Sequence, residues 1–168
     1  GKVDEAVRLY EDLKLQDKFH RDLDMKKQWD DDIEALIPSL ERFSQTLVLQ
    51  GGAENFQRAG AILKDIADSN PKHALRNAEY AEFAYLQGKS TEAEVYYNRA
   101  LSQSDIDRFK RVEWKLKIAD IYHERGVLSK SADVYWNTID LIQDLPSDCL
   151  ATSLLLIISR RISSTISL

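Results

Sequence analysis

The chain has 168 residues, of which 43% are hydrophobic and 30% charged, and its formal net charge is -5 at pH 7. This composition is typical of a folded domain and excludes an intrinsically disordered chain. The acidic balance argues against a general nucleic-acid binder, because such a protein needs a basic face to neutralise phosphates. We therefore expect no nucleic-acid partner.

Few residues interrupt regular structure, since the chain has only six glycines and three prolines, so long helices are expected. The single cysteine, Cys149, excludes an internal disulfide, and we interpret it as a small core residue rather than a nucleophile. No signal peptide is visible, and the apolar run from Leu154 to Ile158 falls far short of the roughly 20 residues that span a bilayer. We expect a cytoplasmic protein without a membrane span. Because the chain opens on Gly1 rather than methionine, we also expect a fragment of a longer chain.

The N-terminal part, residues 1–37, is predicted to hold half of a helical hairpin followed by irregular helices. Its opening, "GKVDEAVRLYEDL", is helical in pattern, whereas the segment that follows is longer and charged. The densest acidic cluster, "WDDDIE" from Asp30 to Glu34, lacks the glycine turn of a calcium loop. We interpret these acids as a solvated helix N-terminus, where they favour the helix dipole.

Residues 38–73 are predicted to form a divergent helical hairpin. Its first helix is expected to start at Pro38, because proline suits the first turn of a helix. Gly51 and Gly52 would form the turn, and "ENFQRAGAILKDIADSNP" would supply the second helix.

Two later segments, Gly88 to Leu101 and Gly126 to Ile139, repeat one pattern of residue sizes. In both, a small residue follows the glycine by five positions, a tyrosine by nine and a small residue by twelve: Ala93, Tyr97 and Ala100, then Ser131, Tyr135 and Thr138. Gly1, Ala6 and Tyr10 match the same frame, although Leu13 breaks its last position. These offsets fall on one helical face, which indicates a face that packs on another helix rather than one that holds a ligand.

Each of these segments reads as the second helix of a helix–turn–helix unit, with the units at residues 74–111 and 112–146. Gly88 and Gly126 suit the left-handed position just past the first helix, and Ser90 and Ser129 are candidate N-caps of the second. The two glycines are 38 residues apart, and the extra turn is expected to lengthen the helix near Arg108 to Arg111.

The tail, residues 147–168, is predicted to start a terminal helix after Pro146. It would be the first helix of a further unit whose second helix is absent. Its apolar face would then act as a cap, meet a second copy of the chain, or belong to a truncated unit.

These units resemble the tetratricopeptide repeat (TPR) family, on the residues Tyr80, Ala81, Ala84, Gly88, Ala93, Tyr97 and Ala100, then Ile118, Ala119, Tyr122, Gly126, Ser131, Tyr135 and Thr138. The resemblance implies an all-α fold, an α-solenoid of stacked helix-turn-helix repeats in a right-handed superhelix, over a single domain of residues 1–168. Asn77 and Lys115 stand where the family usually has Trp or Leu, and Asp105 replaces the customary closing proline after the first of these two units.

Motifs for chemistry are missing from the sequence. Lys89 follows a glycine, but no glycine precedes it at phosphate-loop spacing. No HExxH or paired-cysteine motif occurs, and the three histidines lie far apart in sequence. We therefore expect no catalytic residue, no cofactor, no metal site and no enzymatic activity. The aromatic pairs Tyr96-Tyr97 and Tyr135-Trp136 are better explained by core and groove lining than by base stacking.

In arrays that resemble this one, the first helices of the units line a concave groove that holds a peptide. The resemblance places nine residues there as the predicted partner-binding set: Glu79, Glu82, Tyr85, Leu86, Glu113, Lys117, Asp120, His123 and Glu124. Acids stand at most of the positions where a subset of the family grips a C-terminal carboxylate with Lys, Asn and Arg, so we do not expect that ligand. An acidic groove with aromatic and aliphatic footholds predicts a basic or amphipathic segment of a protein partner.

The first prediction of function is thus a protein–protein interaction scaffold. The alternative for the groove is that its acids only keep an exposed surface soluble. Two other function classes stay open: a regulatory or sensor segment of a larger multidomain protein, and a self-assembly module that forms a homo-oligomer through the C-terminal helix.

Overall fold

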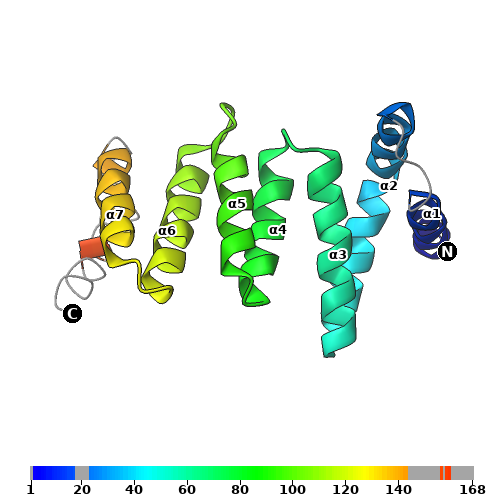
Figure 1. The fold of residues 1–168 in the computed structure, drawn as a ribbon, viewed down its shortest axis with the longest axis horizontal. Helices are drawn as coiled ribbons and strands as arrows, with labels where there is room; N and C mark the ends of the chain where they lie inside the picture. Colours follow the sequence, from blue (N-terminus) through cyan, green and yellow to red (C-terminus); the bar gives the residue numbers. More distant parts are fainter. Residues whose placement is uncertain (1, 18–22, 144–155, 157, 160–168) are drawn as a thin grey trace.

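The computed structural model describes residues 2–17, 23–143, 156, 158 and 159. Cys149 and most of the predicted terminal helix lie outside these residues. The described part holds seven α-helices and no strand, and Figure 1 shows the helices arranged side by side in an elongated row. In chain order they are α1 (Lys2–Asp17), α2 (Leu23–Gln50), α3 (Ala53–Ser69), α4 (Ala74–Leu86), α5 (Ser90–Leu101), α6 (Arg108–Glu124) and α7 (Leu128–Gln143).

Six of the helices form three consecutive hairpins. The pairs α2–α3, α4–α5 and α6–α7 make the most extensive contacts, and α3 with α4 and α5 with α6 join one hairpin to the next. Each unit therefore touches its neighbours along the chain, as in a solenoid. The predicted all-α solenoid of helix-turn-helix units is confirmed.

The turns inside two of the hairpins depend on glycine. Gly88 follows α4 with φ 75°, and Gly126 follows α6 with φ 73°, a region that residues with a Cβ atom rarely adopt. The predicted N-caps at Ser90 and Ser129 are wrong. Ser90 is the first residue of α5 and Ser129 lies inside α7, because each helix begins directly after the glycine turn.

The predicted lengthening near Arg108 is confirmed, because α6 has 17 residues and α4 has 13. Asp107 is the N-cap of α6, and its carboxylate accepts hydrogen bonds from the amides of Phe109 at 2.9 Å and Lys110 at 3.3 Å. The extra turn therefore lies at the beginning of the helix, where this cap satisfies two of its free amides.

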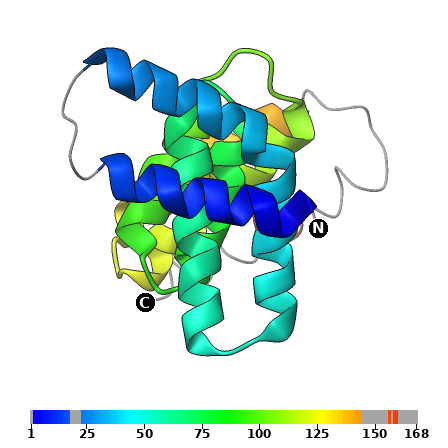
Figure 2. The same cartoon turned by 90° about the vertical axis from the view of Figure 1, so that its right-hand side faces the viewer.

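The helix that we expected to start at Pro38 begins instead at Leu23 and contains Pro38. In Figure 2 its first part lies across the top of the array, and its second part runs alongside α3. Proline bends a helix because it cannot donate to the carbonyl four residues earlier, here that of Glu34. The helix continues through the bend, since Ile37 and Leu40 on either side of Pro38 are both buried.

The continuous α2 also changes the interpretation of the acidic cluster. Residues 30–34 lie within α2 and not at a helix N-terminus, so the predicted interaction with the helix dipole is wrong. Only the Glu34 side chain of this cluster is described, and it binds Arg76 at 3.1 Å and Asn70 at 3.1 Å.

The helix α1 packs on the α2–α3 hairpin. Figure 2 shows it lying across α3 rather than along it. Tyr10, the aromatic residue of the predicted stripe, is buried, and its hydroxyl donates to Asp65 of α3 at 2.5 Å. The unit boundaries proposed from the sequence stay predictions.

The core is divided into three clusters along the array, with a middle cluster shared by α3, α4, α5 and α6. All six residues of the predicted stripe on α5 and α7 are buried: Ala93, Tyr97, Ala100, Ser131, Tyr135 and Thr138. Their predicted role in helix packing is confirmed. From the tail, Ile158 is fully buried in the last cluster together with Val112, Tyr135 and Ile142.

A membrane-spanning helix would have to be both long and apolar, and the described residues contain no helix that meets both conditions.

Candidate partner-binding face

The nine residues predicted to bind a partner lie on two helices. Four are on α4 and five on α6, which are the first helices of consecutive hairpins. Two side-chain contacts join these helices directly: Lys117 donates to Glu82 at 2.9 Å, and the hydroxyl of Tyr85 donates to Glu124. The contacts show that residues 35 and 39 positions apart in sequence lie side by side. We call the nine residues the α4–α6 face.

Two acids of this face accept hydrogen bonds from buried tyrosines on the second helices of the hairpins. The hydroxyl of Tyr97 on α5 donates to Glu82 at 2.5 Å, and the hydroxyl of Tyr135 on α7 donates to Asp120 at 2.5 Å. In both hairpins the tyrosine follows its acid by 15 positions, so the contact repeats from one unit to the next. The acids are thus fixed in position by the core.

Glu82 is stabilised in its charged form. Burial opposes its ionisation, but the hydrogen bonds from Tyr97 and Lys117 outweigh burial, and the pKa of Glu82 is lowered. The Lys117 ammonium also lies over the Tyr85 ring, 5.9 Å from its centroid. The face therefore carries its own cation, placed between an acid and an aromatic ring.

Glu79 has a different environment. Glu79 is exposed, but neighbouring groups remove part of its hydration. This partial desolvation, followed by repulsion from Glu41 on α2, raises the pKa of Glu79, although Arg76 partly offsets both effects. Arg76 is already shared, since it contacts Glu34 at 3.1 Å and Glu41 at 3.8 Å. The region between α2 and α4 therefore holds more negative charge than its cation neutralises.

Leu86 and Glu113 are open to solvent, and His123 on α6 is half-buried. Leu86, at the end of α4, is 62% exposed, and Glu113 is exposed with Lys110 at 3.1 Å from its carboxylate. Among the nine residues, five are carboxylates and one is a lysine. The structure places all nine on neighbouring helices, with an apolar foothold at Leu86 and an excess of negative charge.

The second helices of the hairpins carry a different polar cluster. Asp68 on α3 accepts hydrogen bonds from Tyr96 at 2.6 Å and from Arg99 at 2.9 Å, both on α5. Lys64 adds contacts to Asp68 at 3.2 Å and to the Tyr96 hydroxyl at 2.8 Å. Because each charge in this cluster has a partner of opposite sign, we interpret it as a connection between hairpins.

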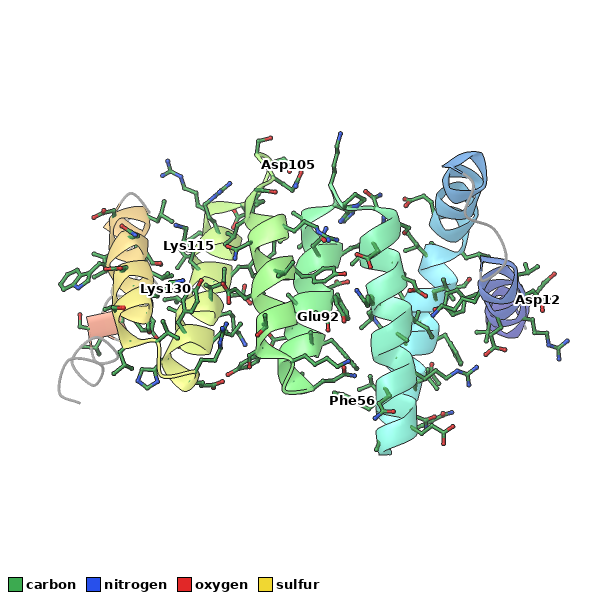
Figure 3. All side chains as sticks on the ribbon, viewed as in Figure 1. Asp12, Phe56, Glu92, Asp105, Lys115 and Lys130 are labelled. Atoms are coloured by element: carbon green, nitrogen blue, oxygen red, sulfur yellow. The ribbon has the colours of Figure 1, made fainter. Side chains whose placement is uncertain are left out.

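The described residues contain no group of three or more His, Cys, Asp or Glu side chains placed to hold a metal ion. Figure 3 shows the side chains along the whole row, with Glu92 and Lys130 on second helices and Lys115 on α6.

Three residues shape the α4–α6 face although the sequence does not predict this role for them. The sequence predicts Tyr97 and Tyr135 only as core residues, whereas their hydroxyls also fix Glu82 and Asp120. The equal spacing of 15 positions in two aligned units was the signal for these pairs. Glu41 had no such signal, because its effect on Glu79 depends on how α2 packs beside α4.

Comparisons with known proteins show a structural likeness to solved proteins. No family model matches the chain, and no curated protein matches its sequence. Among solved structures, a thermophilic TPR protein of Thermus thermophilus matches with a TM-score of 0.54 at 18% sequence identity. The match covers 99% of this chain and 98% of the other. Together with the three consecutive hairpins, it shows that this chain has the helical-repeat fold of a TPR protein.

Proposed function

We propose that the chain is a protein–protein interaction scaffold, and that its α4–α6 face binds a basic or amphipathic segment of a partner protein. The observation that carries this proposal is the charge of the face, where five carboxylates accompany one lysine on two neighbouring helices. Such an excess attracts a cationic segment and speeds its encounter with the face. The TPR fold of the chain is consistent with this role, since stacked helical repeats offer extended binding surfaces.

The fixed geometry of the acids supports binding rather than mere solubility. A solubilising carboxylate needs no particular position, whereas Glu82 and Asp120 are each held by a buried tyrosine at 2.5 Å. Acids that are already ordered lose little conformational freedom when a partner binds. The exposed Leu86 supplies apolar contact area next to them.

The experiment that tests the proposal is affinity capture with the intact chain and a pair of charge-reversed variants. In the face variant, Glu79→Lys is combined with Glu113→Lys. Both side chains are exposed, and neither makes a hydrogen bond to a buried tyrosine. In the control variant, Glu54→Lys on α3 is combined with Asp133→Lys on α7, two exposed acids on second helices.

The two variants change the net charge equally, so a general electrostatic effect lowers capture in both. The proposal predicts that specific partners are retained by the control variant and lost from the face variant. A third variant reverses Glu79, Glu82 and Asp120 together and is expected to abolish capture, provided that circular dichroism shows an intact helical fold. Unchanged capture by both the face variant and the triple variant would contradict the proposal.

A further inference from the structure

A cavity of about 500 Å³ lies at one edge of the array, between the α3–α4 turn and the α5–α6 loop. Figure 1 shows both connections at the same edge, and Figure 3 shows Asp105 on the loop there. None of the nine residues of the α4–α6 face lines this cavity. Its volume is within the range of about 300 to 1,000 Å³ that is usual for small-molecule sites.

Part of the cavity is lined by apolar side chains, and some of this apolar surface is exposed to solvent. Leu75 lines it and is 51% exposed, and Ile106 lines it from the α5–α6 loop. Trp114 lines it from α6 and is only 4% exposed, yet its indole N–H donates no hydrogen bond within the described residues. The indole nitrogen stays in contact with solvent. Trp114 therefore offers apolar contact area together with an N–H that no described residue accepts.

The first turn of α4 forms the polar part. The amides of Ala74 and Leu75, both lining residues, have no acceptor in the described structure, whereas the amide of Arg76 donates to His73 Nδ1 at 3.4 Å. Unpaired amides and the helix dipole favour an anion at this position. Lys72 stands beside them, exposed, with no ion pair in the part of the chain that the structure describes.

Two acids also line the cavity and limit where an anion can bind. The carboxylate of Asp107 is occupied by the amides of Phe109 and Lys110 as the cap of α6. Asp105 opposes an anion from the facing loop, and Lys110 is partly neutralised by Glu113 at 3.1 Å. The favourable position for an anion is therefore the α4 side, next to Lys72.

We propose that this cavity binds a small amphipathic carboxylic acid. Its aromatic or aliphatic body packs against Leu75, Ile106 and Trp114, and its carboxylate accepts hydrogen bonds from the Ala74 and Leu75 amides beside Lys72. The proposal is independent of the α4–α6 face, because the two surfaces share no residue.

The experiment titrates 3-phenylpropionate into the intact chain and follows backbone amide and indole resonances by NMR. Its neutral amide, 3-phenylpropionamide, has nearly the same shape and lacks the charge. We expect the acid to shift the Ala74, Leu75 and Trp114 resonances and to bind at least several-fold more tightly than the amide. Equal affinity for the two compounds, or no shift at these resonances, would overturn the proposal.

Three variants test where in the cavity the carboxylate of the ligand binds. Lys72→Ala is expected to weaken binding of the acid by about 2- to 5-fold, as is usual for one exposed charge near a helix terminus. Asp105→Asn is expected to strengthen it. Lys89→Ala, at the other end of α4, is the matched control and should leave the affinity unchanged. An equal loss in the Lys72 and Lys89 variants would contradict the assigned position.

A last experiment tests whether the carboxylate belongs to a free small molecule or to a peptide side chain. N-acetyl-Phe-Glu-amide carries the same two groups within a peptide, with its only carboxylate on a side chain. We expect it to bind more weakly than 3-phenylpropionate. Binding of the peptide without binding of the free acid would overturn the proposal and indicate an acidic protein segment instead.

Discussion

The hydroxyl of Tyr97 on α5 donates a hydrogen bond to the carboxylate of Glu82 on α4 at 2.5 Å. The same contact recurs one unit later, where Tyr135 on α7 donates to Asp120 on α6 at 2.5 Å. In each hairpin a buried side chain thereby fixes an acid that takes part in the α4–α6 face. The core of the array and its candidate binding face are connected through these two hydrogen bonds.

Tyr97→Phe tests this connection. The change keeps the buried ring and removes one hydrogen bond to a charged but partly exposed acid, so we expect the free energy of unfolding to fall by about 1 kcal/mol. Urea unfolding followed by circular dichroism measures the effect. Tyr85→Phe is the matched control, because its hydroxyl bonds the exposed Glu124, and a smaller loss is expected.

A double-mutant cycle of Tyr97→Phe with Glu82→Gln isolates the pair from other effects of each change. We expect a clear coupling energy. Purely additive effects of the two substitutions would show that the contact does not stabilise the fold.

Lys117→Met tests whether the face is partly occupied by its own cation. Lys117 donates to Glu82 at 2.9 Å, and both side chains are partly exposed. Loss of such an ion pair changes the free energy of unfolding by at most about 1 kcal/mol. The freed Glu82 should bind a partner's cation more strongly, so calorimetry is expected to show tighter binding of a basic segment. Weaker binding would mean that Lys117 itself contacts the partner.

The pH dependence of stability depends on acids whose pKa values shift in opposite directions. The pKa of Glu34 is lowered, because hydrogen bonds from Asn70 and Arg76 outweigh the effect of burial. Its stabilising contribution is therefore present above the unfolded pKa, near 4, and is lost as the pH falls through the folded pKa. The pKa of Glu79 is raised, so its contribution is present at low pH and is lost as the pH rises through the folded pKa.

Two isosteric variants separate these effects. At pH 7, Glu34→Gln is expected to lower the free energy of unfolding and Glu79→Gln to raise it. The Glu79→Gln difference should shrink as the pH falls through the raised folded pKa of Glu79 and vanish by about pH 4. The Glu34→Gln difference should shrink only as the pH falls below about 4, through the lowered folded pKa of Glu34. Thermal unfolding across this pH range measures them, and effects of the same sign at pH 7 would contradict the assigned charge environments.

Gly60→Ala tests the close approach of α3 to α4. A Cβ atom on Gly60 would lie 2.6 Å from Nε2 of Gln87 and 3.0 Å from the ring of Phe83. Alanine normally favours a helix over glycine by about 1 kcal/mol, so an uncrowded site would be stabilised. We expect a net loss of about 1 to 2 kcal/mol instead, since the Phe83 ring must move within a packed core. Chemical denaturation decides the sign, and a stabilised variant would show that the two helices separate easily.

The sequence predicted those parts of the fold that depend on local patterns. The glycine turns, the buried stripe on α5 and α7 and the longer α6 follow from residue sizes and spacing, and all are present. The start at Pro38 was wrong, because the helix-breaking effect of proline is offset by the burial of Ile37 and Leu40 around it. The serine caps were wrong because each turn was one or two residues shorter than expected.

The candidate site was predictable as a set of residues but not as a set of interactions. The repeat frame placed Glu82 and Lys117 on corresponding helices, yet their 2.9 Å contact depends on how the two hairpins stack. Similarly, the effect of Glu41 on Glu79 arises only where α2 packs beside α4. The cavity next to Trp114 brings together two connections that are about 30 residues apart, and no local pattern in the sequence indicates it.

The most direct test of the proposed scaffold is a chemical-shift map of the intact chain, recorded while a partner segment recovered by capture is added. We expect the largest changes on α4 and α6, at residues such as Glu79, Leu86 and Glu113, and an affinity that falls as salt is raised. Changes concentrated on α5 and α7, or an affinity independent of salt, would contradict it.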